Sequence, residues 1–176
     1  KYEMAIEQYE IWAEAAFVVG AQERLTMAQL YYQLERKDDS LRSVKLGISE
    51  AEAKGILPKE SFWALGTALY NEKNQMDKVV DYLEKLVTHY PKWKYWKQLG
   101  GMFGAQERMT DQLVAYEVIY LNGELTKESD VLAMAYMYLG AEVPYRAAKI
   151  IEKGIKDEIV EKNFKHYDLL GKSWFL

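Results

Sequence analysis

The sequence predicts an all-α fold, an α-solenoid of stacked antiparallel helix pairs with about ten helices in its 176 residues. Apolar and small residues recur at helical spacing, as in Trp96, Leu99, Gly100 and Phe103 at i, i+3, i+4 and i+7. A similar arrangement returns about every 34 residues along the chain. Only three prolines interrupt the sequence, so long helices are permitted.

The repeat divides the chain into units of one solenoid domain. We expect a lone second helix, four full helix pairs and a lone first helix, with bounds near 1–20, 21–59, 60–92, 93–127, 128–163 and 164–176. The step from 21 to 60 is the longest, and it needs a longer second helix through Glu50–Lys54. The first and last units are partial. This predicts a fragment of a longer protein and leaves room for an oligomer formed through the incomplete terminal units.

Each expected first helix combines large residues with small ones. Small residues such as Gly100 let the two helices of a pair approach, and large residues such as Trp96 fill the wedge against the next pair. We therefore expect Trp96 in the core. The corresponding sets elsewhere are Met27, Ala28 and Tyr31; Trp63, Gly66 and Tyr70; Met134, Ala135 and Tyr138; and Leu170, Gly171 and Trp174.

Helix boundaries are predicted from capping chemistry. Asn74, Thr110 and Thr126 precede predicted helices and are suitable N-cap residues, because their side chains can accept a hydrogen bond from the first turn. Gly55 and Gly123 lie where helices are expected to stop, because glycine adopts the left-handed conformation without strain.

The pentapeptide Gly-Ala-Gln-Glu-Arg occurs at Gly20–Arg24 and again at Gly104–Arg108. The copies start 84 residues apart, about two and a half periods, so we interpret them as a helix connector used at two different places. In each copy the glycine is expected to end a helix in the left-handed conformation. A rival register aligns Trp12 with Trp96 and makes the copies equivalent, but it leaves an unpaired helix before Ser61.

These helix pairs resemble the tetratricopeptide repeat (TPR), whose pattern is Trp-x2-Leu-Gly-x2-Tyr, then Ala-x3-Phe, then Pro, over about 34 residues. Trp96, Leu99 and Gly100 match this pattern, whereas Phe103 stands where the family has Tyr. The resemblance implies a superhelix with a concave groove, lined by first helices, that receives an extended or helical peptide.

The groove prediction follows from this resemblance. Amide and tyrosine hydroxyl groups can pair with a peptide backbone, and lysines can meet carboxylates. The alternative for each position is ordinary solvated surface. A chaperone-tail adaptor is not expected. The adaptors of that group hold a carboxylate with a clamp of Lys and Asn residues, and only Lys97 matches this clamp here. The predicted protein-binding groove comprises Gln22, Gln29, Tyr32, Gln33, Asn71, Lys94, Lys97 and Tyr136.

Composition argues against several other functions. A net charge of −4 without a basic face argues against nucleic acid, and no apolar run has the roughly 20 residues of a membrane span. The chain has no cysteine, and His89 and His166 lie in different units, where we expect both to be exposed. No motif for a nucleophile, a phosphate or a metal is present. We therefore predict no enzyme activity, no cofactor and no metal.

Residues 125–132, 143–155 and 159–163 resemble TPR proteins of Gram-negative bacteria associated with TonB/ExbB/ExbD-type systems. The resemblance covers about the last two thirds of the chain. It implies a bacterial, exported protein that works in the periplasm with TonB/ExbB/ExbD-type partners; the alternative location is the cytoplasm.

The function predicted from these observations is a non-enzymatic protein–protein interaction scaffold that binds a protein or peptide segment. The alternative is a sensor or regulatory TPR domain that binds a small peptide or ligand and changes curvature on binding.

Overall fold

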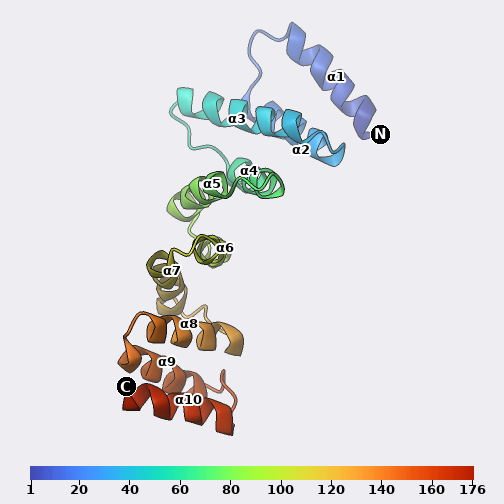
Figure 1. The fold of residues 1–176 in the computed structure, drawn as a ribbon. Coiled ribbons are helices and arrows are strands. Elements are labelled where there is room, and N and C mark those ends of the chain that lie inside the picture. The colour runs from blue at the N-terminus through green and yellow to red at the C-terminus, as the bar shows by residue number, and fades with distance from the viewer. The chain divides into compact units, whose positions relative to one another are not determined.

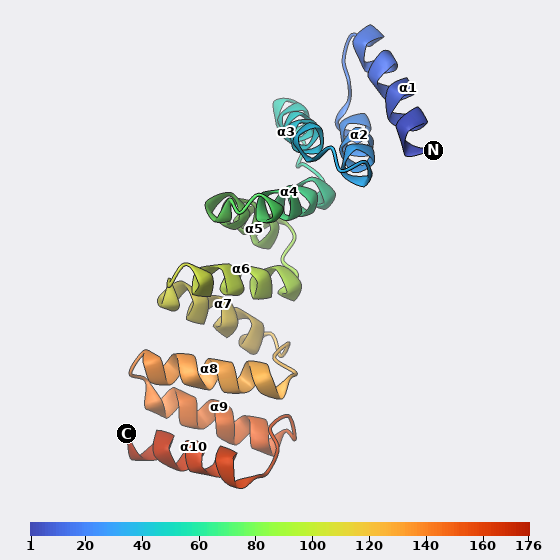
Figure 2. The same cartoon turned by 45° about the vertical axis from the view of Figure 1, so that its right-hand side comes forward.

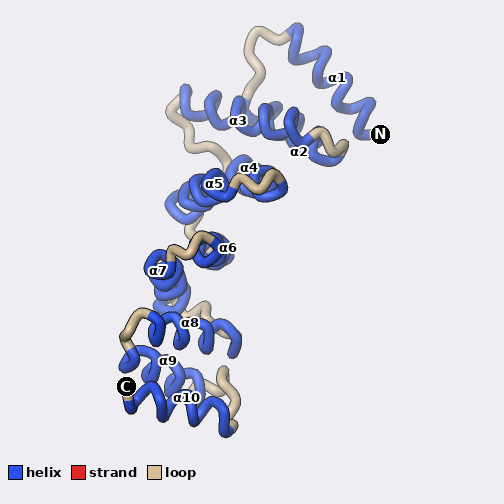
Figure 3. Tube along the Cα trace, viewed as in Figure 1, coloured by secondary structure: helices blue, strands red, loops and turns tan.

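The computed structural model describes residues 1–176, which form ten α-helices and no strand (Figures 1 and 3). The chain divides into two compact units, Lys1–Pro91 (unit 1) and Lys92–Leu176 (unit 2). The helices of unit 1 are α1 Tyr2–Ala15, α2 Ala21–Gln33, α3 Lys37–Ala53, α4 Glu60–Glu72 and α5 Met76–His89. Those of unit 2 are α6 Trp93–Ala105, α7 Met109–Leu121, α8 Glu128–Gly140, α9 Pro144–Lys156 and α10 Phe164–Phe175.

Neighbouring helices pair within each unit. In unit 1, α2 packs on α3 and α4 on α5, while α1 covers α2 and α3 contacts α4. In unit 2, α6 packs on α7 and α8 on α9, with α10 against α9; Figure 2 shows α6 to α10 following one another as successive layers. The all-α solenoid of helix pairs that the sequence predicts is therefore confirmed.

The first helices expected near residues 21, 60, 93, 128 and 164 begin at Ala21, Glu60, Trp93, Glu128 and Phe164. The longest helix is α3, with 17 residues. It is the second helix of the 21–59 unit, for which the sequence predicted a longer second helix. Because α2 packs more extensively on α3 than on α1, the structure favours the expected pairing of α2 with α3 over the rival register. The assignment of the whole chain to a single solenoid domain stays a prediction.

Glycine allows an aromatic ring to lie directly against a neighbouring helix in unit 1. A Cβ atom added at Gly66 would lie 2.2 Å from the Tyr82 ring of α5, and one at Gly47 would lie 2.3 Å from the Phe62 ring of α4. Ordinary van der Waals contact needs more than 3.4 Å. These positions therefore exclude any larger side chain unless the ring moves.

The prediction that Trp96 lies in the core is wrong, because its side chain is less buried than expected. Trp96 is only partly buried against the core of unit 2, whereas Tyr95, Leu99 and Phe103 form the buried stripe of α6. The other expected positions, Leu99, Gly100 and Phe103, are buried, so the inward face of α6 is largely as predicted. Tyr95 takes the buried place that was expected for Trp96. In unit 1 the equivalent large residue Trp63 is buried, with 5% of its surface exposed.

The turns inside the helix pairs share one backbone geometry. Glu35, Asn74, Glu107 and Glu142 each have φ between 54° and 58°, the left-handed region. The amide that follows donates to the carbonyl five residues before it, as Arg36 N–H does to Tyr31 at 2.9 Å. This is the Schellman arrangement, here without glycine. Gly55 and Gly123 end α3 and α7 with φ of 66° and 74°, as predicted.

The predicted N-caps are wrong. The N-cap positions of α5, α7 and α8 are Gln75, Arg108 and Lys127, and none of these makes a side-chain cap bond. Within the pairs, the reason is the tight Schellman turn, which starts α5 and α7 within two residues of the left-handed residue. Only α10 has a side-chain cap, where Asn163 accepts the His166 N–H at 3.0 Å.

The two pentapeptide copies occupy different structures, as their spacing predicts, but neither glycine stops a helix. Gly20 has φ −68° and is the N-cap of α2, so the first copy opens a helix. Gly104 lies inside α6, and the left-handed residue of the second copy is Glu107. The predicted left-handed role of both glycines is therefore wrong.

Candidate protein-binding surface

Five of the predicted groove residues lie in unit 1. Gln22, Gln29, Tyr32 and Gln33 belong to α2, and Asn71 belongs to α4. The four amide side chains are exposed and Tyr32 is half-buried. Gln22 accepts a hydrogen bond from the ammonium group of Lys59, which precedes α4.

Tyr32 holds two helix pairs together. Its hydroxyl donates to Glu72 Oε1 at 2.8 Å, and Lys37 Nζ lies 2.9 Å from Glu72 Oε2. The hydrogen bond from Lys37, followed by that from Tyr32, lowers the pKa of Glu72. The hydrogen bond to this carboxylate raises the pKa of Tyr32. Tyr32 is thus already engaged within unit 1, and Gln29, Gln33 and Asn71 are the predicted residues that face solvent there.

The other three predicted residues lie in unit 2. Lys97 Nζ of α6 is 2.6 Å from Asp130 Oδ2 of α8, and its charge is therefore offset inside the protein. Burial raises the pKa of the nearby Tyr116 hydroxyl, and the negative charge of Asp130 raises that pKa further. Lys94 Nζ lies 4.6 Å from the centre of the Tyr95 ring.

Tyr136, the third, borders an open cavity of about 440 Å³ between α7 and α8. About half of its surface, 52%, is exposed. The wall is largely apolar, and the only side-chain polar groups on it are the hydroxyls of Thr110 and Tyr136. The lining residues are Met109, Thr110, Leu113, Ala133, Tyr136, Met137, Gly140 and Ala141.

Sequence reasoning missed most of this cavity. Met109, Leu113 and Met137 carry no motif, and they line one cavity only because α7 and α8 lie side by side. A signal was present in Gly140 and Ala141, since two small residues at the end of a helix leave space that larger neighbours do not fill. The flexible thioethers of the two methionines suit a surface that adapts to its ligand.

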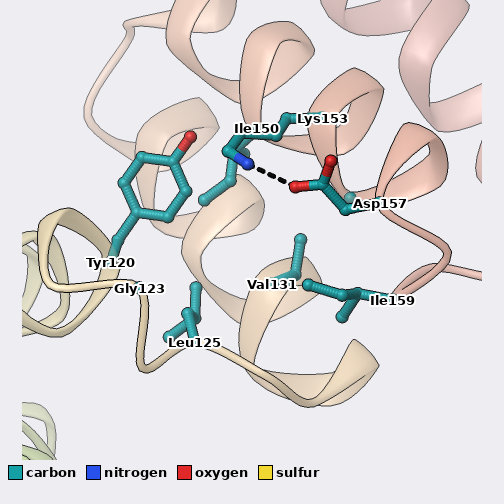
Figure 4. Close-up of a pocket in the computed structure, with 9 residues that line it drawn as sticks. Tyr120, Gly123, Leu125, Val131, Ile150, Lys153, Asp157 and Ile159 are labelled. Carbon is teal, nitrogen blue, oxygen red and sulfur yellow. Dashed lines mark hydrogen bonds and ion pairs between the residues drawn. The ribbon is translucent and has the colours of Figure 1, made fainter.

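Two further cavities lie in unit 2. One, of about 100 Å³, is lined by Tyr120, the α7–α8 loop and α9. Figure 4 shows the Lys153–Asp157 ion pair on one side of it and Leu125, Val131 and Ile159 on the other. The second, of about 470 Å³, lies between α7 and α9; it is lined by Glu117, Tyr120, Leu121, Tyr138, Arg146, Lys149 and Ile150.

Both histidines were expected to be exposed, and this is wrong for His166. His89 is exposed, whereas only 4% of the His166 surface is exposed, and Glu128 of α8 lies 3.9 Å from its Nε2. His166 Nδ1 lies 2.9 Å from the Glu161 carbonyl oxygen, which satisfies this buried ring nitrogen. No group of three or more His, Asp or Glu residues could hold a metal ion. No helix combines the length and hydropathy needed to cross a membrane.

Comparison with known proteins gives a likeness of fold. No family model matches the chain, and no curated protein matches it in sequence. Among solved structures, MamA from Desulfovibrio magneticus RS-1 superposes with a TM-score of 0.58 at 14% identity, covering 89% of this chain and 85% of that one. A further structure, MamA AMB-1, reaches 0.65 at 16% identity over 91% and 85%.

The C-terminal part of a TPR repeat-containing protein from Cytophaga hutchinsonii also superposes. Its TM-score is 0.60 at 15% identity, covering 98% of this chain and 65% of that one. At such identities the likeness concerns the fold alone, and nothing in these structures supports the predicted TonB/ExbB/ExbD association. The chain is therefore an all-α solenoid with a TPR-like fold.

Proposed function

We propose that the chain is a scaffold that binds a segment of another protein, with the α7–α8 cavity as its anchor pocket. The observation that carries this proposal is an open, mostly apolar cavity of about 440 Å³ beside the half-exposed Tyr136. Ligand sites are typically concave and apolar, with a few polar groups that orient the ligand. A TPR-like fold is compatible with this role but does not establish it, because folds do not determine function.

The lining suggests the chemistry of the bound segment. Met109, Leu113 and Met137 would surround an apolar side chain of the partner, because burial of such an anchor supplies much of the binding energy at protein interfaces. The Tyr136 and Thr110 hydroxyls can donate to or accept from the backbone of the same segment. The partner is therefore a peptide segment with a large apolar residue flanked by accessible backbone.

A cavity-filling variant tests the proposal. Gly140 lines the cavity, and a Cβ atom added there would meet no atom within 4 Å, so Gly140→Leu starts a side chain in open space beside the cavity. Gly171→Leu on α10 is the matched control, because its Cβ also meets nothing and it lies outside the cavity. Fluorescence anisotropy with labelled synthetic peptides, each carrying one aromatic or leucine anchor, measures affinity.

We expect Gly140→Leu to weaken the peptides that bind by tenfold or more, while Gly171→Leu leaves their affinity unchanged. Equal affinities in the two variants would refute the pocket assignment. Thermal stabilisation by small molecules but not by any peptide would favour the sensor alternative instead.

We further propose that the protein works in the periplasm with TonB/ExbB/ExbD-type partners. The resemblance of residues 125–132, 143–155 and 159–163 to TonB-associated TPR proteins supports the periplasm and TonB/ExbB/ExbD-type partners. Fractionation of cells that express the full gene tests the location, and recovery in the cytoplasm alone would contradict it. Co-purification with tagged ExbB or TonB, compared in wild type and Gly140→Leu, tests the partner.

A further inference from the structure

The charges of the chain are unevenly divided between its two units. Unit 1 contains 11 basic and 15 acidic residues, so it carries the whole net charge of −4. Unit 2 contains 12 of each and is neutral. Within the units the segregation is sharper, since α1 contains four glutamates and no basic residue, whereas α9 contains four basic residues and one glutamate.

The outer face of α1 combines acidic and apolar residues. Ile6 is the buried residue of α1, and it faces the core that contains Met27 and Tyr31. On the opposite side of the helix, Met4 and Ile11 are 71% and 58% exposed, and Glu7 and Glu14 are exposed beside them. Each of these two pairs is separated by seven residues, which is two turns or about 10 Å.

The outer face of α9 repeats this spacing with opposite charge. Its buried residues Ala147, Ile150, Ile151 and Gly154 face the core of unit 2. The outer face therefore presents Arg146, Lys149, Lys153 and Lys156, all of them exposed. Lys149 and Lys156 are two turns apart, as are Arg146 and Lys153, so each pair matches the Glu7–Glu14 spacing.

Apolar surface accompanies the cations of α9. The rings of Tyr145 and Trp174 meet edge to face at 5.6 Å, and they are 61% and 46% exposed. Lys149 Nζ lies 5.0 Å from the centre of the Trp174 ring. On the other side of Lys149, the 470 Å³ cavity between α7 and α9 includes the exposed Leu121.

We propose that the chain associates with a second copy of itself by docking the outer face of α1 on the outer face of α9 of that copy. Glu7 and Glu14 then face the lysines, and Met4 and Ile11 face the Tyr145–Trp174 cluster and the cavity. Three of the four cations already have an acidic neighbour within unit 2: Arg146 pairs with Glu117, Lys149 with Glu152 and Lys153 with Asp157. Such exposed pairs contribute little and can exchange partners. Because the two faces differ, the contact is heterologous and builds rings or longer chains.

Charge reversal on the full chain tests the proposal by sedimentation velocity over a concentration series. The wild type should assemble as concentration rises, and high salt should reduce this assembly by screening the charges. Glu7→Lys/Glu14→Lys and Lys149→Glu/Lys156→Glu should each sediment as monomers, because like charges then face each other. An equal mixture of these two variants should regain the assembly, since their reversed faces are complementary.

Two controls with the same change in net charge keep the result specific. Glu52→Lys/Glu84→Lys lies on exposed positions of α3 and α5, and Lys162→Glu/Lys165→Glu lies on exposed positions outside α9. Both should assemble as the wild type does, and circular dichroism should show all variants folded. A wild type that stays monomeric at its highest soluble concentration overturns the proposal. Failure of the mixture to assemble, or loss of assembly in the controls, overturns it equally.

Discussion

Tyr31 in unit 1 and Tyr138 in unit 2 stand at equivalent places in their helices, near the end of α2 and of α8. The Tyr31 hydroxyl donates to Glu10 Oε1 at 2.9 Å, and Arg36 donates to the same oxygen at 3.0 Å. The Arg36 guanidinium also lies 4.5 Å from the centre of the Tyr31 ring. One carboxylate thus joins the helix before the pair to both helices of the pair.

Tyr138 repeats this arrangement. Its hydroxyl donates to Glu117 Oε1 at 2.8 Å, and Arg146 donates to the same oxygen at 2.6 Å. The glutamate precedes the tyrosine by 21 residues in both units. The repeat of the contact follows from the repeat of the helix packing.

The surroundings of the two triads differ. In unit 1, Arg36 also pairs with Asp39 at 2.9 Å, so a second carboxylate holds the guanidinium. In unit 2, Arg146 has no second acid, its side chain is 59% exposed, and it lines the 470 Å³ cavity with Glu117 and Tyr138. The same contact is present in both units, and in unit 2 it borders a cavity. A shared local contact therefore does not determine which side chains surround it.

The largest predicted effect tests how differently the two units use their tryptophans. Trp63→Ala should lower the free energy of unfolding by about 3–5 kcal/mol, as for other buried aromatic residues. Trp96→Ala should cost clearly less, because Trp96 is only partly buried. Urea denaturation of both variants measures the difference. Equal losses would mean that Trp96 is as deeply packed as Trp63.

A second variant sharpens this result. The Trp63 indole N–H is buried without a hydrogen-bond partner. Trp63→Phe removes that unsatisfied donor and keeps most of the ring, so it should be much less destabilising than Trp63→Ala.

The next effect compares the triads directly. Tyr31→Phe and Tyr138→Phe each remove one hydrogen bond to a carboxylate, and each should cost about 1.5 kcal/mol. Double-mutant cycles with Glu10→Gln and Glu117→Gln should show coupling within each triad. A neutral Tyr138→Phe beside a destabilising Tyr31→Phe would show that the two triads are not energetically equivalent.

A smaller effect comes from the left-handed turn residues. Glu107→Gly in unit 2 should raise stability by about 0.5–1 kcal/mol, since relief of the left-handed strain exceeds the added chain entropy. Gly55→Ala in unit 1 should lower stability by about 1 kcal/mol for the opposite reason. Thermal melting measures both, and Glu152→Gly inside α9 is the control that should destabilise. A destabilised Glu107→Gly would contradict the predicted strain.

The smallest effect concerns the Tyr31 hydroxyl, and it appears only in alkaline solution. Burial, and then the hydrogen bond to Glu10, raise the pKa of Tyr31 from 10.0 to about 12. Between pH 10 and 12 the folded state therefore retains the Tyr31 proton that the unfolded state has lost. The contribution of the Tyr31 hydroxyl to the free energy of unfolding is complete below pH 10 and is lost as the pH rises toward 12. Tyr31→Phe should show a shallower decline between pH 10 and 12 in urea denaturation. Parallel curves for wild type and variant would contradict this.

The sequence alone predicted the helices well and the details of their ends poorly. Helical periodicity and the spacing of Trp63, Gly100 and Ala135 located the first helix of each pair, because apolar burial must recur at every pair. The predicted caps Asn74, Thr110 and Thr126 failed, because tight Schellman turns replaced side-chain capping. Of the predicted groove residues, only Tyr136 borders the candidate pocket, and the binding role of all eight stays a prediction.

What the sequence determined by itself is the number, order and pairing of the helices, since these depend on periodic patterns along the chain. What only the tertiary structure decided is where space and charge remain after packing. Met109 and Met137 line one cavity, Lys97 pairs with Asp130, and His166 becomes buried because different helices are brought side by side. Such contacts depend on the distances between helices, which no local pattern encodes.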